Sequence, residues 1–223
     1  MTHLAIFDYG AGNLHSLVKA ISTDERTISI ETDVRAAMTA DLLVLPGVGA
    51  FGAAADAMQN SQSYLAAALV DGLPCLGICL GMQLLFDASE ESPGKGIGLI
   101  PGNVTRLRTS KVPHMGWNDI DWRETREIGG AGDIERLKTG NNGAQTGNGH
   151  AARTLDTAYF ANAYICEPEV DLPILAWTTH ENAKFASVVR SANTVGVQFH
   201  PEKSSGTGLA FLNAIIEDLI ACR

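Results

Sequence analysis

The chain comprises 223 residues, of which 45% are hydrophobic, and carries a net charge of −9. That length buries one sizeable core but is short for two complete domains, so we expect a single domain over residues 1–223. An acidic chain without a block of lysine and arginine does not attract a phosphate backbone, which argues against nucleic-acid binding and favours a small molecule or a protein as partner.

The N-terminal residues predict no export signal. Met1 to His3 lead directly into an apolar run, with neither a basic leader nor a small-residue cleavage site. Later apolar runs are interrupted by Pro or Gly well short of the ~20 residues that cross a bilayer. We therefore expect a cytoplasmic protein without a membrane segment.

The first ninety residues alternate between short apolar runs and helix-like stretches. Strands separated by helices imply right-handed crossovers and a parallel sheet covered on both faces. The expected strands are 4–9, 26–31, 42–45 and a run that ends at Cys79, and the expected helices are 13–21, 34–38 and 53–70.

The second half has a different pattern. β-rich runs at turn-length spacing suit an antiparallel extension of the sheet, and residues 206–221 form an amphipathic helix that closes the chain. The expected strands are 103–108, 176–179, 186–190 and 194–199. Between them, the glycine-rich stretch at 128–150 is too polar to order itself well, and we expect a mobile surface loop there. The predicted class is an open, mostly parallel α/β fold.

The four cysteines match neither a zinc site nor a disulfide framework, so we expect reduced thiols and no metal. Cys75, Cys166 and Cys222 lie in apolar surroundings and are expected to be buried. Cys79 differs, because the pattern Gly-x-Cys-x-Gly follows an apolar strand and opens a helix-like stretch. Such a sharp turn projects the thiol into a cleft at the positive end of a helix, where the thiolate is favoured.

A nucleophilic cysteine needs a base and a group that orients the base. Six histidines are available, and His200 stands out because it ends a buried strand pattern, at the sheet edge where α/β sites form. Glu202 lies two residues later, so both side chains point to the same side. Either motif alone is also compatible with an ordinary structural role. Together they favour a catalytic array of Cys79, His200 and Glu202.

A glycine-rich segment, Pro46 to Gly52, follows the third expected strand. Its simplest interpretation is a turn. Gly47, Val48 and Gly49 can also bring backbone N–H groups close to a ligand and, with the N–H of Leu80, stabilise an oxyanion. The spacing differs from that of the dinucleotide-binding fingerprint, and we expect no cofactor.

With these three segments, the chain resembles class I, or triad, glutamine amidotransferases along nearly its whole length. The motifs are the run from Pro74 to Gln83 and the run from Gln198 to Glu202. The resemblance implies a flavodoxin-like fold and a reaction in which Cys79 attacks L-glutamine and His200 protonates the departing ammonia. It also implies that Gln83, Ala163 and Tyr164 bind the substrate.

A narrower resemblance is to the HisH family, the glutaminase subunits of imidazole glycerol phosphate synthase. It rests on the segments 8–14, 46–52, 112–118 and 201–205. It implies a heterodimer with HisF, a (β/α)8 barrel that receives ammonia and makes imidazole glycerol phosphate and the aminoimidazole carboxamide ribonucleotide in histidine biosynthesis.

The residues that match family interface positions are Asn13, Pro113, Met115, Trp117, Tyr159 and Lys203. Each also has a simpler interpretation: Asn13 as a helix cap, Trp117 as a core residue and Lys203 as a solvated charge. One departure concerns Asn162 and Ala163, which stand where the family commonly has His and Ser or Thr. That segment lies near glutamine and the interface in the family.

Three other functions remain open at this point. The chain can be the amidotransferase of another synthase, a non-catalytic glutamine-sensing scaffold of the same fold, or a hydrolase with the same elbow. The intact Cys79, His200 and Glu202 argue against a scaffold. A hydrolase explains neither Gln83 nor the interface-like segments.

Overall fold

The computed structural model describes residues 1–10, 14–58, 61–123, 155–170 and 174–222. The glycine-rich loop predicted at 128–150 lies outside these ranges. Among the helices in the described ranges, none is long and apolar enough to span a membrane.

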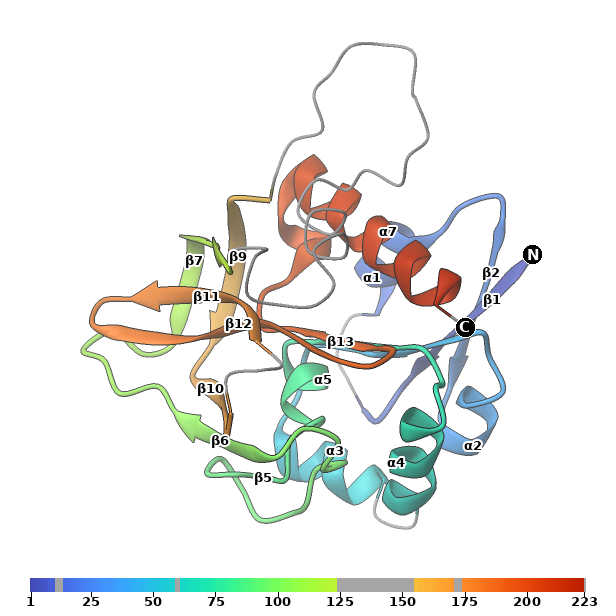
Figure 1. Cartoon of the computed structure of the whole chain (residues 1–223), viewed down its shortest axis with the longest axis horizontal. Coiled ribbons are helices and arrows are strands. Elements are labelled where there is room, and N and C mark those ends of the chain that lie inside the picture. The colour runs from blue at the N-terminus through green and yellow to red at the C-terminus, as the bar shows by residue number, and fades with distance from the viewer. Residues whose placement is uncertain (11–13, 59–60, 124–154, 171–173, 223) are drawn as a thin grey trace.

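An eight-stranded sheet crosses the molecule (Figure 1) in the order β2-β1-β3-β4-β13-β12-β11-β8. The strands from β2 to β13 are parallel, in the flavodoxin-like order, and the remaining strands are antiparallel. The bounds are β1 Thr2–Phe7, β2 Arg26–Glu31, β3 Leu42–Leu45, β4 Cys75–Ile78, β8 Asp121–Trp122, β11 Ile174–His180, β12 Ala183–Ser191 and β13 Thr194–Val197. The predicted mostly parallel α/β class with an antiparallel extension is confirmed.

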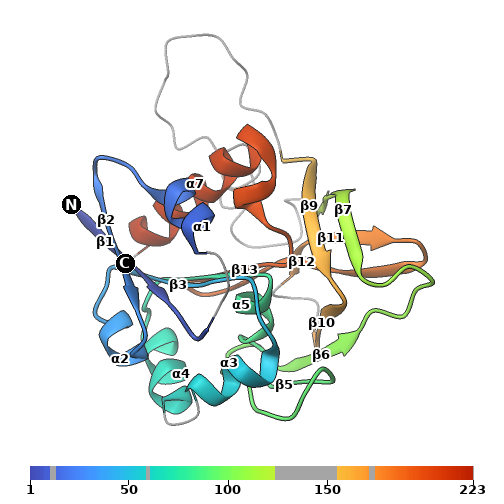
Figure 2. The same ribbon diagram turned by 180° about the vertical axis from the view of Figure 1, so that it is seen from behind.

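Helices cover both faces of this sheet, as Figures 1 and 2 show from opposite sides. One face carries α1 His15–Ile21 and α7 Ser205–Ala221. The other carries α2 Val34–Ala37, α3 Phe51–Met58, α4 Gln62–Val70 and α5 Leu80–Gln83. The prediction of one helix over 53–70 is wrong, because α4 begins anew after Ser61, a residue type favoured at helix starts.

The parallel strands divide the interior into two cores. In β1, Leu4 and Ile6 pack in the core beneath α1 and α7, whereas Ala5 and Phe7 pack in the core on the opposite face. Successive side chains of a strand point to opposite faces, so a strand buried on both sides must be apolar throughout. This is why these strands stand out as short continuous apolar runs.

Two smaller sheets lie beside the main one. The strand predicted at 103–108 exists as β6 Gly102–Arg106, but it pairs with β10 Tyr164–Pro168 and β5 Ala88–Ser89 instead of extending the main sheet. Its main partner lies about sixty residues later in the chain, and no local pattern reveals such pairing. β7 His114–Asp119 and β9 Thr157–Asn162 form a two-stranded β7–β9 ribbon.

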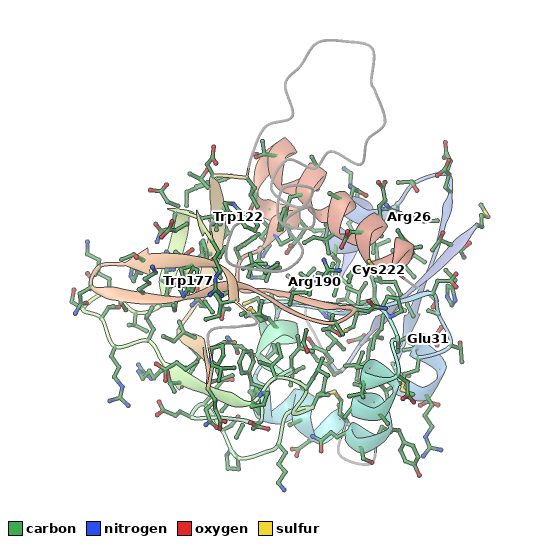
Figure 3. All side chains as sticks on the ribbon, in the orientation of Figure 1. Arg26, Glu31, Trp122, Trp177, Arg190 and Cys222 are labelled. Atoms are coloured by element: carbon green, nitrogen blue, oxygen red, sulfur yellow. The ribbon has the colours of Figure 1, made fainter. Side chains whose placement is uncertain are left out.

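The buried positions predicted for Cys75 and Cys166 are confirmed, but that of Cys222 is wrong, since its side chain is exposed. Cys222 caps the end of α7, beyond the last buried residue of that helix. Its sulfur lies 3.7 Å from the guanidinium of Arg190. Both residues are labelled in Figure 3. The apolar residues next to Cys222 in the sequence were therefore a misleading sign of burial, because the helix ends there.

Phe199 joins separate parts of the core and provides a stability test. Its ring is fully buried. The centroid of the ring lies 5.7 Å from the ring centroid of Phe160 and 5.6 Å from that of Phe211. We expect Phe199→Ala to lower the free energy of unfolding by about 3–5 kcal/mol, since it leaves a cavity. Urea denaturation measures this loss. The control Val70→Ala removes a side chain that is 72% exposed and should change stability by less than about 0.5 kcal/mol. Equal effects of the two changes would contradict the assignment.

Candidate functional site

Cys79 lies at a sharp turn between β4 and α5 and has a φ of 48°. Gly77 and Gly81 make that turn possible, because a Cβ at Gly77 would lie 2.7 Å from the Gly81 backbone and one at Gly81 would collide with the Leu45 carbonyl. The Cys79 N–H donates to the Val197 carbonyl at 2.7 Å, which ties the turn to β13. The predicted elbow is therefore present.

His200 follows the end of β13, next to β4 in the sheet. A 3-10 helix at Pro201–Lys203, η2, turns Glu202 back toward the ring. The Glu202 carboxylate lies 2.8 Å from His200 Nδ1, and both side chains are almost fully buried. The carboxylate thereby selects the tautomer and orientation of the imidazole and leaves Nε2 for Cys79.

The charge state of His200 follows from these neighbours. Burial lowers the pKa of an imidazole, but hydrogen bonds to Cys79 and Glu202 and the negative charge of both outweigh burial and raise the pKa of His200 to about 9. The ring therefore keeps its proton at neutral pH. A protonated imidazole beside the sulfur favours a thiolate–imidazolium pair, which is the reactive form of a catalytic cysteine.

The glycine segment after β3 lies against the same group. A Cβ added at Gly47 would be 3.0 Å from His200 Cε1, so only glycine lets the backbone approach the ring this closely. Tyr9 is buried and its hydroxyl donates to the Pro46 carbonyl, which anchors the start of the segment. Leu80 is the first residue of α5, so its N–H has no partner within the helix.

A cavity of about 190 Å³ opens beside the Cys79 side chain. Its size is below that of typical drug-sized pockets of roughly 300–1,000 Å³ and suits a molecule as small as an amino acid. The residues around it are Gly47, Val48, Gly49, Cys79, Leu80, Gln83, Glu91, Ala161, Asn162, Ala163 and Tyr164. All predicted oxyanion and substrate residues therefore come together here, with the nucleophile.

Two residues of the site were not predicted. Glu91 brings a carboxylate to the cavity, where one of its oxygens accepts the Phe51 N–H at 2.7 Å. Gln198 is fully buried and its amide lies 3.5 Å from the sulfur of Cys79. Gln198 lies two residues before His200 in an extended run of sequence, and this spacing was an available signal, because alternate residues of an extended segment share a face. No local signal marked Glu91.

Of the residues predicted to face a partner, Met115, Trp117 and Tyr159 lie on the β7–β9 ribbon and Lys203 lies on η2. Pro113 immediately precedes β7. Met115 and Trp117 are 64% and 54% exposed, which excludes the alternative of Trp117 as a core residue. The Trp117 ring meets the half-buried Tyr159 ring edge to face at 6.4 Å. Pro113 and Lys203 are exposed, and Asn13 lies outside the described residues.

The ribbon is bonded directly to the backbone of the base. The His200 N–H donates to the Tyr159 carbonyl at 2.9 Å, and the Tyr159 N–H donates to the Ser204 hydroxyl at 2.9 Å. That hydroxyl donates in turn to the His200 carbonyl at 2.7 Å. The exposed aromatic surface and the catalytic array are therefore parts of one hydrogen-bonded unit.

Asn162, where the sequence departs from the resembled family, is 4% exposed and belongs to the cavity wall. Its Nδ2 donates to the Tyr164 carbonyl at 3.0 Å. Gln83 Nε2 donates to the same carbonyl at 3.3 Å. Asn162 and Gln83 therefore both help to position the backbone at Tyr164.

The chain matches known proteins over nearly its whole length. The family model for glutamine amidotransferase class-I matches residues 5–217. A protein of Pyrococcus furiosus called imidazole glycerol phosphate synthase subunit HisH is 41% identical, over 95% of this chain and 97% of the relative. A protein of the same name from Methanothermobacter thermautotrophicus is 37% identical, over 96% and 98%.

Solved structures show the same fold. A crystal structure described as a glutamine amidotransferase has a TM-score of 0.69 at 13% identity and covers 99% of this chain and 100% of that one. The structure of PurLQS from Thermotoga maritima has a TM-score of 0.68 at 17% identity and covers 98% and 100%. At such low identity, these two structures establish the fold alone.

The two causes of the raised pKa of His200 can be removed separately. Glu202→Gln replaces the carboxylate with a neutral amide, and Cys79→Ala removes the sulfur, so we expect the pKa of His200 to fall from about 9 in both variants. Ring chemical shifts followed against pH by NMR measure it. His114, whose pKa is lowered to about 4 by burial and by His180, should titrate unchanged and serves as the internal control.

The same shift has a consequence for stability. A pKa raised in the folded state contributes stability that is fully present below the unfolded value of about 6.5 and is lost as pH rises through about 9. Glu202→Gln should flatten the pH dependence of unfolding in that window. A His200 titration that is unchanged in both variants would contradict this account.

Proposed function

The chain belongs to the class I glutamine amidotransferase family, and from that premise we propose that it is the glutaminase subunit of an imidazole glycerol phosphate synthase. The observation that carries the proposal is the buried array of Cys79, His200 and Glu202 beside an amino-acid-sized cavity. Similarity to HisH subunits over nearly the whole length of both chains supports the choice of synthase.

The proposed reaction begins with attack of the Cys79 sulfur on the side-chain amide carbon of glutamine. The carbonyl oxygen becomes an oxyanion, stabilised by the N–H of Leu80 and by N–H groups of the Gly47–Gly49 segment. His200 gives its proton to the departing nitrogen, and ammonia leaves a glutamyl thioester on sulfur. Water then attacks the thioester while His200 accepts its proton, and the C–S bond breaks to release glutamate.

Substrate recognition is assigned to the wall of the cavity. We propose that the Glu91 carboxylate binds the α-ammonium group of glutamine, because Glu91 is the one acidic side chain among the described residues that form the cavity. Gln83 and the backbone at Ala163 and Tyr164 complete the site. The hydrogen bonds that Gln83 and Asn162 donate to the Tyr164 carbonyl support this placement.

The ammonia needs a protected route, since ammonia released to water is protonated and loses its nucleophilic lone pair. We propose that HisF, a (β/α)8 barrel, docks on the β7–β9 ribbon and η2 and conducts ammonia to its own active site. There it enters the synthesis of imidazole glycerol phosphate and the aminoimidazole carboxamide ribonucleotide. The exposed residues proposed for this surface are Pro113, Met115, Trp117 and Lys203, together with half-buried Tyr159. Asn13, which lies outside the described residues, is proposed for the same surface from the family resemblance alone. A cytoplasmic location is part of the proposal, since a catalytic thiol must stay reduced.

The nucleophile provides the first test, with the chain and HisF assayed together. We expect Cys79→Ala to reduce glutamine-dependent synthesis of imidazole glycerol phosphate by about 10⁴-fold or more, because no thioester can form. Synthesis from added ammonium salt should remain, since that route bypasses the thiol. Cys222→Ala, which changes an exposed cysteine, is the matched control and should leave both activities intact. Loss of both activities in Cys79→Ala would defeat the proposal.

The ribbon provides the second test. Truncating an aromatic anchor at the centre of an interface costs about 1–3 kcal/mol, so Trp117→Ala should weaken binding of HisF about 5- to 150-fold, as measured by calorimetry. Tyr64→Ala is the matched control, because Tyr64 is 56% exposed and lies on α4, across the sheet from the ribbon (Figure 1). Equal binding by all three proteins would show that the ribbon is not the docking surface.

A further inference from the structure

Gln198 lies between the nucleophile and a residue assigned to the substrate. Its Nε2 donates to the sulfur of Cys79 at 3.5 Å, and its Oε1 accepts from Gln83 Nε2, also at 3.5 Å. The second contact is at the long end for an N–H···O bond, while the first is normal for the larger sulfur atom. A fully buried carboxamide that makes these two contacts is not explained by packing alone.

The backbone holds Gln198 firmly in this place. Its N–H donates to the Ser187 carbonyl at 2.9 Å, immediately after β13. Val195, Val197 and, just beyond β13, Phe199 pack in the core on one face of the sheet, whereas the intervening Gly196 and Gln198 face the other way. Gly196 lies against Met82 of α5, where a Cβ would come within 2.8 Å, so the sheet packs tightly against the elbow. Gln198 and His200 therefore both approach Cys79 from the segment that follows β13.

The hydrogen bonds also fix which way the amide points. The Tyr164 carbonyl only accepts, so the nitrogen of Gln83 must face it at 3.3 Å. The same nitrogen reaches the oxygen of Gln198, which leaves the nitrogen of Gln198 directed at the sulfur. The Tyr164 carbonyl, the two carboxamides and the Cys79 sulfur thus form one chain of contacts, in which the orientation of each carboxamide is fixed.

We propose that Gln198 is a positioning residue that holds the sulfur of Cys79 toward His200 and keeps Gln83 oriented for the substrate. The proposal deepens the glutaminase function proposed above and rests on it. As a neutral donor, the amide stabilises the thiolate before attack. It does so again when the C–S bond of the thioester breaks and the electron pair returns to sulfur.

The pH dependence of Cys79 alkylation reports directly on this role. Among the described residues, Tyr9 and Cys166 interact electrostatically with Cys79, as His200 does. Burial is the larger cause and the charge on Cys79 the smaller one, and together they raise the pKa of Tyr9 and of Cys166 well above the usual values. Both side chains therefore stay neutral over the pH range in which Cys79 reactivity is measured. Burial likewise raises the pKa of nearby Cys75, and the carboxylate of Glu91 lies in the cavity wall.

The test replaces Gln198 with Met, which has a similar length and no amide. Loss of a hydrogen bond to a charged group predicts that kcat for glutamine hydrolysis, measured with HisF bound, falls about 10- to 100-fold, with a smaller rise in KM. In the isolated chain, the pH midpoint for alkylation of Cys79 by iodoacetamide should rise by about 1 unit. Both changes are expected because the thiolate loses its donor.

Thr194→Val is the matched control. Thr194 lies on β13 with the same facing, is 1% exposed, and its hydroxyl has no hydrogen-bond partner among the described residues. This variant should keep the wild-type midpoint and kcat. Gln198→Asn, which retains an amide one methylene short of the sulfur, is measured in parallel and should also raise the midpoint, so that a folding failure of the Met variant leaves the test intact.

The outcomes separate the two proposals. A midpoint within about 0.2 units of wild type and a kcat within about twofold, in whichever variant folds by circular dichroism, overturns the role of Gln198. Alkylation requires neither glutamine nor HisF. A wild-type chain that is alkylated at Cys79 but hydrolyses no glutamine with HisF bound therefore defeats the glutaminase function and leaves the alkylation result for Gln198 standing.

Discussion

The positive φ of Cys79 is the constraint around which the site is arranged. Such a conformation costs a non-glycine residue on the order of 1–3 kcal/mol and persists only when the surrounding structure holds it. Here β4 is buried in the middle of a parallel sheet, Gly77 and Gly81 allow backbone contacts that a side chain would block, and β13 accepts the Cys79 N–H. The chain then leads from the end of β13 to His200. The neighbouring strands β4 and β13 therefore both hold Cys79 in its strained conformation and place His200 beside it.

Parts of the fold that depend on local burial were predictable, and parts that depend on distant pairing were not. The bounds of β2 and β3 match their predictions, since an apolar or alternating run between turns identifies a strand. β6 was found as a strand but not with its correct partner, because pairing with β10 spans the segment at 124–154. The break between α3 and α4 was missed because the alanine-rich sequence remains helix-favouring on both sides of it.

For the site, residues carried by short motifs were predictable. The glycines around Cys79 and the spacing of His200 and Glu202 reflect backbone geometry that sequence records directly. Glu91 reaches the cavity from a loop that follows α5 by several residues, and only tertiary packing brings its carboxylate there. Gln198 lay within a recognised motif, yet its role depends on the direction of an amide, which sequence does not specify.

The hydrogen bonds between Tyr159, His200 and Ser204 have a consequence for inhibition. A compound that binds the exposed ribbon at Trp117 does not enter the cavity beside Cys79, so glutamine has no means of displacing it. It nevertheless contacts a ribbon that is hydrogen-bonded to the backbone of His200, the proposed base. Inhibition from this surface would therefore be noncompetitive with the amino-acid substrate and would persist at glutamine concentrations that defeat any substrate analogue.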